Sequence, residues 1–381
     1  MPVVATVPGH LLGDVKITCI PTEDDPESKQ VIESQSTFHV YEKHKCHKCI
    51  LSVSVAAKEH KAKGVKQKKS KDHGVPPVQS DDDAFFLHRP YLAFHLPPRV
   101  LYMGNSKHSA KPIVLIHDGC FWQEYKLQLG PAISQPGVID PRSVVAWRHN
   151  GGNKKMIKAD DGKLKGYKVR RWRLWGETGK EYVHTVKANR KTGEGQDPDV
   201  LERLDSKPGS HAVAEEVVYL RWKNPLSLNT RCYHFQYRGV DFYWKGTKSV
   251  KASRACGFLL YFNHLKLVAK LPTSEEDKHE EGELCLGTFT SSVANRKNGT
   301  LEFFDATILR FIDEHFPSLS LRKQSEERLE NTQAGRILEI KRSQLFHVFV
   351  ATAMCMIRSE KEKRHTLLDL AVNIAEGGGS G

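Results

Sequence analysis

The feature that most constrains the fold is a thirteen-residue segment near the C-terminus, Leu345–Ile357, that is apolar on every face. Only His347 and Thr352 interrupt it. A helix that is apolar all round must be enclosed by protein or by lipid. The segment falls short of the roughly 20 residues that a membrane-spanning helix needs. We therefore expect no transmembrane segment, and we expect the rest of the protein to surround this helix up to the charged run that begins at Arg358.

The chain from Phe85 to about Phe304 consists of short apolar or alternating runs separated by glycine-containing turns. Such runs begin at Phe85, Val100, Ile113, Phe121, Val144, Tyr167, Tyr182, Val217, Tyr233, Val240, Phe258, Leu265 and Leu284. The turns between them include Asp118-Gly119, Asp161-Gly162, Thr178-Gly179, Arg238-Gly239 and Asn298-Gly299. This pattern is typical of consecutive antiparallel strands. It predicts a mainly β (α+β) protein, a large antiparallel β-barrel of roughly a dozen strands that encloses the C-terminal helix. A second helix should begin at Asp305 and end before Pro317.

A run of hairpins followed by one helix that is apolar all round resembles the tubby C-terminal-like superfamily, which includes tubby, LURP-one-related and phospholipid scramblase-like proteins. The resemblance covers Phe85 to Glu376 and rests on the hairpin turns and on Leu345–Ile357. It implies a non-enzymatic module that reads phosphoinositide headgroups or acts as an adaptor. Neither the closing segment of true tubby proteins nor the calcium-site pattern of scramblases is present. The rival architecture is a helix-grip carrier with a lipid cavity, but its C-terminal helix would be amphipathic, so we prefer the enclosed helix.

The chain divides into three parts by composition. Residues 1–83 should form a poorly ordered basic leader, because Lys58–Lys71 is rich in lysine and Pro76-Pro77 and an acidic trio follow it. Residues 84–376 should form the barrel domain with its C-terminal helices. Residues 377–381 have the composition of a flexible linker scar.

Charge is concentrated in one segment, which supplies the candidate site. The chain carries a net charge of +13, and thirteen cations against four carboxylates place +9 of it between Lys154 and Lys191. Tyr167–Leu174 should be a bulged strand with its apolar side chains buried. Its cations would then stand together outside and bind phosphate groups: Lys168, Arg170, Arg171 and Arg173. The expected ligand is an anionic phospholipid, with a phosphoinositide headgroup as the specific form.

Three other interpretations of the same chain stay open. The cations could bind nucleic acid, with Trp172, Trp175, Tyr167 and Tyr182 as stacking platforms. They could instead be a solvated face paired with neighbouring carboxylates. The protein could also be an interaction scaffold that docks partners through Lys58–Lys71 or Arg322–Asn331. The start of the chain and its eight cysteines indicate a reduced, cytoplasmic protein, and attachment to a membrane surface or a nuclear location stays open.

Motifs for catalysis, cofactors or metals are scarce. The sequence contains no nucleophile elbow, phosphate-binding loop, dinucleotide fingerprint or zinc-protease helix. Cys46 and Cys49 supply half of a zinc site with no second pair at finger spacing. His117, Asp118 and Cys120 are best explained as hairpin residues. We expect a protein that is not an enzyme and that needs no cofactor or metal.

Overall fold

A computed structural model describes the chain in segments that together make up the folded domain. They are residues 35–43, 48–52, 84–92, 95–104, 110–119, 124–150, 154–169, 180, 182–184, 187, 191, 212–223, 232–246, 264–271, 282–292, 297–316 and 333–377. The described strands are β1 (Gln35–Lys43), β2 (Lys48–Ser52), β3 (Phe85–His88), β4 (Arg99–Met103), β5 (Lys111–Asp118), β6 (Glu124–Leu129), β7 (Glu216–Lys223), β8 (Cys232–Tyr237), β9 (Val240–Gly246), β10 (Leu265–Lys270), β11 (Glu283–Ser291) and β12 (Lys297–Phe304). The described helices are α2 (Pro131–Ser134), α3 (Lys154–Ala159), α7 (Asp305–His315), α8 (Gln333–Arg342) and α9 (Gln344–Gly377).

The strands pair antiparallel with their neighbours in sequence, which confirms that the protein is mainly β. The chain of pairings returns to its start because β1 pairs with β12 as well as with β2, the order of a closed barrel. Alternate side chains of these strands lie in one buried core with the apolar part of α9. The β8–β9 hairpin turns at Arg238 and Gly239, with φ of 47° and 83°. Both values are typical of a type I′ hairpin turn, at the position where a turn was predicted.

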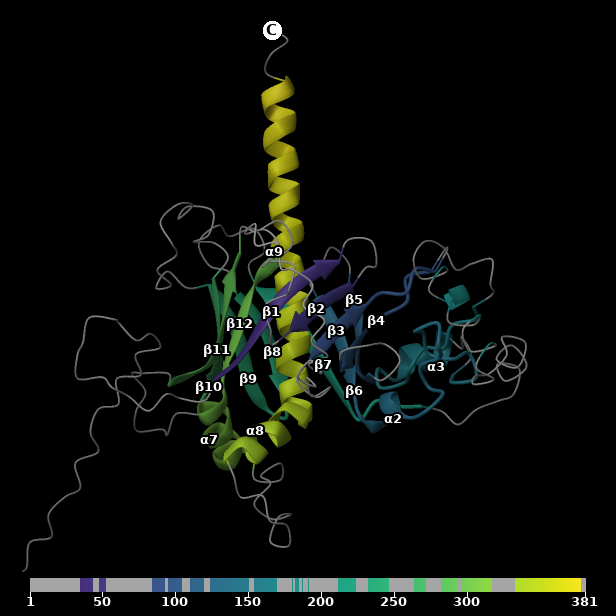
Figure 1. Cartoon of the computed structure of the whole chain (residues 1–381), viewed down its shortest axis with the longest axis horizontal. Helices are drawn as coiled ribbons and strands as arrows, with labels where there is room; N and C mark the ends of the chain where they lie inside the picture. The colour runs from purple at the N-terminus through teal and green to yellow at the C-terminus, as the bar shows by residue number, and fades with distance from the viewer. Residues whose placement is uncertain are drawn as a thin grey trace, which may run out of the picture.

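Strands on several sides contact α9, which runs among them in Figure 1. The ring of Phe346 lies 6.3 Å from Phe38 of β1 and 5.0 Å from Phe303 of β12. Further along, the ring of Phe349 lies 5.3 Å from Phe242 of β9. The segment Leu345–Ile357 is therefore shielded from water by strands, as its composition requires. None of the described helices combines the length and apolar character needed to span a membrane.

The expected domain boundary before Phe85 was wrong, because β1 and β2 belong to the sheet. Phe38 and Val40 alternate along β1 and are fully buried. Burying them joins β1 to β12, about 260 residues later in the chain. The rest of the predicted leader, including Lys58–Lys71, lies outside the described residues, as do Arg322–Asn331 and the linker residues 378–381.

The described residues between β6 and β7, most of them in 130–150, 154–169 and 212–215, form a lobe on the outside of the barrel (Figure 1). Its apolar residues, among them Ile133, Val145 and Leu164, pack against outward-facing side chains of β3, β4 and β5. Strands were predicted from Val144, Tyr167 and Tyr182. Val145 and Tyr167 make only isolated bridges, and Tyr182 is helical. The predicted strand at Phe258 and the turn at Thr178-Gly179 lie outside the described residues.

Asn298-Gly299 was predicted as a hairpin turn, but it lies inside β12. Gly299 pairs with Ser291 of β11. A Cβ atom there would come within 2.3 Å of the Thr290 carbonyl oxygen and 2.6 Å of the Phe289 ring. Glycine is therefore required at this position so that the Phe289 ring and β11 can lie close to the backbone of β12. The sequence alone does not distinguish such a glycine from one in a turn.

The helix predicted from Asp305 is confirmed as α7, and Asp305 itself is a buried carboxyl group. The Ser36 hydroxyl donates a hydrogen bond to its Oδ2 at 2.8 Å. Burial nevertheless raises the pKa of Asp305 from 3.8 to about 6. The folded state thus binds this proton more tightly than the unfolded state does, so stability is lost as pH rises from about 4 to about 6.

We expect Asp305→Asn to raise the free energy of unfolding at pH 7, because the amide removes a buried negative charge. The upper limit is about 3 kcal/mol, from about 2 pKa units at 1.36 kcal/mol each. Urea unfolding at pH 4, 5.5 and 7 measures the effect, which should vanish at the lowest pH. Asp313→Asn, which removes a part-exposed carboxylate 2.9 Å from Arg336, is the control and should change stability by less than about 1 kcal/mol. An equal gain at all three pH values would contradict the assignment.

Candidate functional site

A buried ion pair braces the part of the lobe that carries the predicted site. The side chains of Asp140 and Arg142 are both buried, and the Nε of Arg142 donates to Asp140 Oδ2 at 2.7 Å. The Nη1 of Arg142 donates to the carbonyl of Val169 at 2.8 Å. Burial raises the pKa of Asp140, and the Arg142 guanidinium opposes that shift. The pair fixes the backbone at Val169, immediately after Lys168.

Backbone hydrogen bonds and a crowded glycine hold the residues just before Lys168. The side-chain amide of Asn150 donates to the carbonyl of Leu164 at 2.8 Å, and the N–H of Tyr167 donates to the carbonyl of Val145 at 2.9 Å. A Cβ atom on Gly166 would lie 2.6 Å from the His149 carbonyl oxygen. Only glycine allows this approach. Contacts made by its own backbone with the Asn150 side chain and with the backbone of Val145 therefore position the start of the predicted site.

The lobe is attached to the outer barrel face through Asp161. Its carboxylate accepts hydrogen bonds from the hydroxyl of Tyr219 and, at 3.0 Å, from Nζ of Lys126. These bonds, with Tyr219 the stronger cause, hold the pKa of Asp161 below its usual range. The Gln128 amide donates to the Asp161 carbonyl at 2.7 Å. The contacts tie the basic segment to strands β6 and β7.

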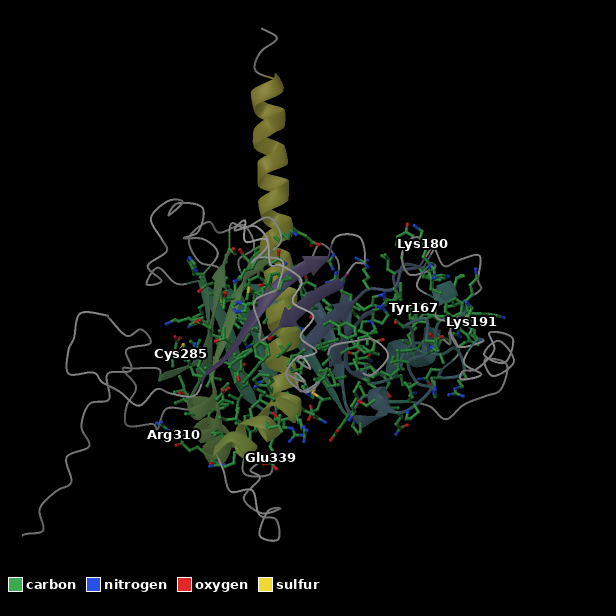
Figure 2. The ribbon with its side chains drawn as sticks, viewed as in Figure 1. Tyr167, Lys180, Lys191, Cys285, Arg310 and Glu339 are labelled. Atoms are coloured by element: carbon green, nitrogen blue, oxygen red, sulfur yellow. The ribbon has the colours of Figure 1, made fainter. Side chains whose placement is uncertain are left out.

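The structure confirms part of the alternation predicted for the site. Lys168 is exposed, whereas Tyr167 and Val169 on either side of it are buried. Arg170, Arg171 and Arg173 lie outside the described residues, so their grouping with Lys168 stays a prediction. Figure 2 shows Tyr167, Lys180 and Lys191 on the lobe, on the far side of the molecule from Arg310 and Cys285.

Other cations of the segment are exposed as well. Those described and exposed are Lys155, Lys165, Lys168, Lys180, Lys187 and Lys191. Lys163 lies 3.9 Å from Asp160, and Nζ of Lys165 lies 5.1 Å from the centre of the Tyr167 ring. Among the described side chains, Lys155, Lys168, Lys187 and Lys191 form no ion pair with a carboxylate. A fully neutralised face is therefore disfavoured in this part of the chain.

The ion pair was not predicted, because the sequence Asp140-Pro141-Arg142 is in itself typical of a simple turn. The turn exists, since the N–H of Ser143 donates to the Asp140 carbonyl at 2.8 Å. The signal that could have found the pair is a carboxylate and a guanidinium two residues apart, with proline between them to restrict the backbone. Their burial depends on packing of the lobe and could not be predicted locally.

Neither metal nor nucleophile chemistry gains support. No group of three or more His, Cys, Asp or Glu side chains in the described segments could hold a metal ion. Cys46 and the side chain of Cys49 lie outside what is described. Burial lowers the pKa of His117 to about 4, and Asp118 is bound to Arg99 at 2.7 Å. His117 hydrogen-bonds Gln128, which gives it a structural role at the base of the lobe.

Comparison with protein-family models, curated proteins and solved structures finds no match to this chain.

Proposed function

We propose that this protein is a non-enzymatic binding module whose lobe recognises anionic phospholipid headgroups, with phosphoinositides as the specific form. The observation that carries the proposal is a short backbone segment, Leu164–Val169, that is held by Arg142, Asn150 and Gly166 and presents the exposed side chains of Lys165 and Lys168. Cations on a fixed backbone suit multivalent phosphate groups. Each cation near an anionic membrane contributes about 1 kcal/mol.

The proposed architecture is a tubby-like barrel built around its own helix. The aromatic contacts of Phe346 and Phe349, and a hydrogen bond of 3.1 Å from Trp244 Nε1 to the Thr352 hydroxyl, support it. In this architecture α9 occupies the space that a helix-grip carrier would offer to a lipid. The ligand would then bind on the outer surface, where the lobe lies.

Lipid is preferred over nucleic acid because of the aromatic residues in the segment. Sequence-tolerant binding of single strands depends on exposed rings that stack on bases. Tyr167 and Tyr182 are each only 6% exposed. Two of the four expected platforms are therefore buried, and Trp172 and Trp175 lie outside the described residues.

We expect the quadruple variant Lys168→Glu, Arg170→Glu, Arg171→Glu and Arg173→Glu to lose at least about 100-fold in affinity for phosphoinositide-containing vesicles. The reason is that attraction to the headgroups becomes repulsion. Flotation of the full chain with vesicles measures the loss.

The matched control reverses four cations on the barrel body and α7: Lys223, Lys266, Lys297 and Arg310. It changes net charge equally and should retain most of the binding. Unchanged flotation of the first variant would refute the proposal. Binding to oligonucleotides with a steep salt dependence, without binding to vesicles, would favour the nucleic-acid interpretation.

A further inference from the structure

Beside the cations, the lobe meets a turn that presents an apolar side chain to solvent. Leu96 is 80% exposed, the highest value among the large hydrophobic residues described as exposed, and Tyr91 of the same segment is 47% exposed. A single exposed leucine is ordinary on a protein surface. Its surroundings distinguish this one.

The turn is braced rather than loosely attached. Leu92 is buried against Val144, Tyr167 and Val169, and the N–H of His95 donates to the Leu92 carbonyl at 3.2 Å. Pro97 and Pro98, which follow Leu96 directly, are buried. Leu96 is thus held outward between a closed turn and two fixed prolines.

One aromatic ring connects the turn to the basic segment. The ring of Tyr167 lies 6.4 Å from the ring of His95, in an edge-on arrangement, and Nζ of Lys165 lies 5.1 Å from the Tyr167 ring centre. Lys168 is the next residue and is exposed. His95, which precedes the exposed Leu96, and the cations Lys165 and Lys168 therefore all lie next to or adjoin one buried tyrosine, Tyr167.

We propose that the exposed side chains of Tyr91 and Leu96 insert into an anionic bilayer while Lys165 and Lys168 contact the headgroup phosphates. The inference deepens the proposed function and rests on it. Binding to a bilayer surface combines burial of apolar area with electrostatic attraction to anionic lipid. Here Leu96 and Tyr91 supply the apolar area, and the cations beside them supply the attraction. A soluble anion would use the cations alone. The bilayer is the partner whose chemistry uses both.

The test is sedimentation of the full chain with mixed phosphatidylcholine and phosphatidylserine vesicles at low and high salt. Leu96→Asn should lower the partition coefficient about tenfold at both salt concentrations, because the lost contribution is apolar. Leu96→Met should bind like the wild type. Lys165→Glu with Lys168→Glu should lose binding mainly at low salt, where charges are least screened.

Val213→Asn is the matched control, because Val213 is another exposed apolar residue of the lobe, 41% exposed, and it bridges to Lys163 rather than to the segment that carries Leu96. It should bind like the wild type. If the wild type binds and Leu96→Asn binds equally well, insertion is refuted while the proposed function stands. If the wild type binds no anionic vesicle, phosphoinositide vesicles included, both fail. Thermal unfolding of each variant verifies the fold, which an exposed position should leave intact.

Discussion

Phe349→Ala is expected to lower the free energy of unfolding by about 4 kcal/mol, within the range for buried phenylalanines. Phe349 is fully buried and its ring lies 5.3 Å from Phe242, 6.3 Å from Phe303 and 6.4 Å from Phe235. These rings come from β9, β12 and β8. Truncation would leave a cavity that three strands border, and strands paired in a ring cannot easily move inward to fill it.

Urea unfolding followed by tryptophan fluorescence measures this loss. Phe349→Leu keeps most of the volume and should cost less than about 1.5 kcal/mol. Arg310→Ala, an exposed position on α7, should stay within about 0.5 kcal/mol of the wild type. A loss for Phe349→Ala no larger than that for Arg310→Ala would mean that α9 is not part of the core.

Local patterns predicted the elements whose side chains alternate or turn in a recognisable way. Tyr233, Phe235 and Tyr237 alternate along the strand predicted from Tyr233, and all three are buried. The helix beginning at Asp305 is also where the spacing of its apolar residues placed it. In each case the signal lies within about ten residues, which is the range over which a periodic pattern has meaning.

The position of β1 was not predictable in the same way. Its alternating Phe38 and Val40 were visible in the sequence, but the lysine-rich stretch that follows led to the interpretation of a leader. Its pairing with β12, together with the pairing of β2 with β3, makes this segment part of the domain. Such a contact joins distant parts of the chain, and composition carries no information about it.

The lobe shows why short apolar runs mislead. A strand was predicted from Val144, yet Val145 is buried in an apolar cluster with Val100 and Leu115 of the barrel strands. A residue buried between two layers and a residue buried in a strand are both apolar, so the sequence pattern does not distinguish them. For the candidate site, alternation did predict the exposure of Lys168, whereas the buried pair behind Val169 arose from tertiary packing.

Arg142→Met is expected to destabilise the lobe by about 3–5 kcal/mol, because it leaves the Asp140 carboxylate buried without its cation and the Val169 carbonyl without its donor. The barrel core contains neither residue, so it should stay folded. Hydrogen exchange should show lost protection at Val144–Val169 and retained protection in β8 and β9. Adding Asp140→Leu should recover much of the loss, since an apolar pair carries no desolvated charge.

The control is Arg238→Met, which breaks a part-exposed pair with Glu216 at 3.1 Å and should cost less than about 1 kcal/mol. Loss of vesicle binding by Arg142→Met together with an intact barrel would show that the cations act only when this backbone is held, and equal protection in the variant and the wild type would refute the role of the pair.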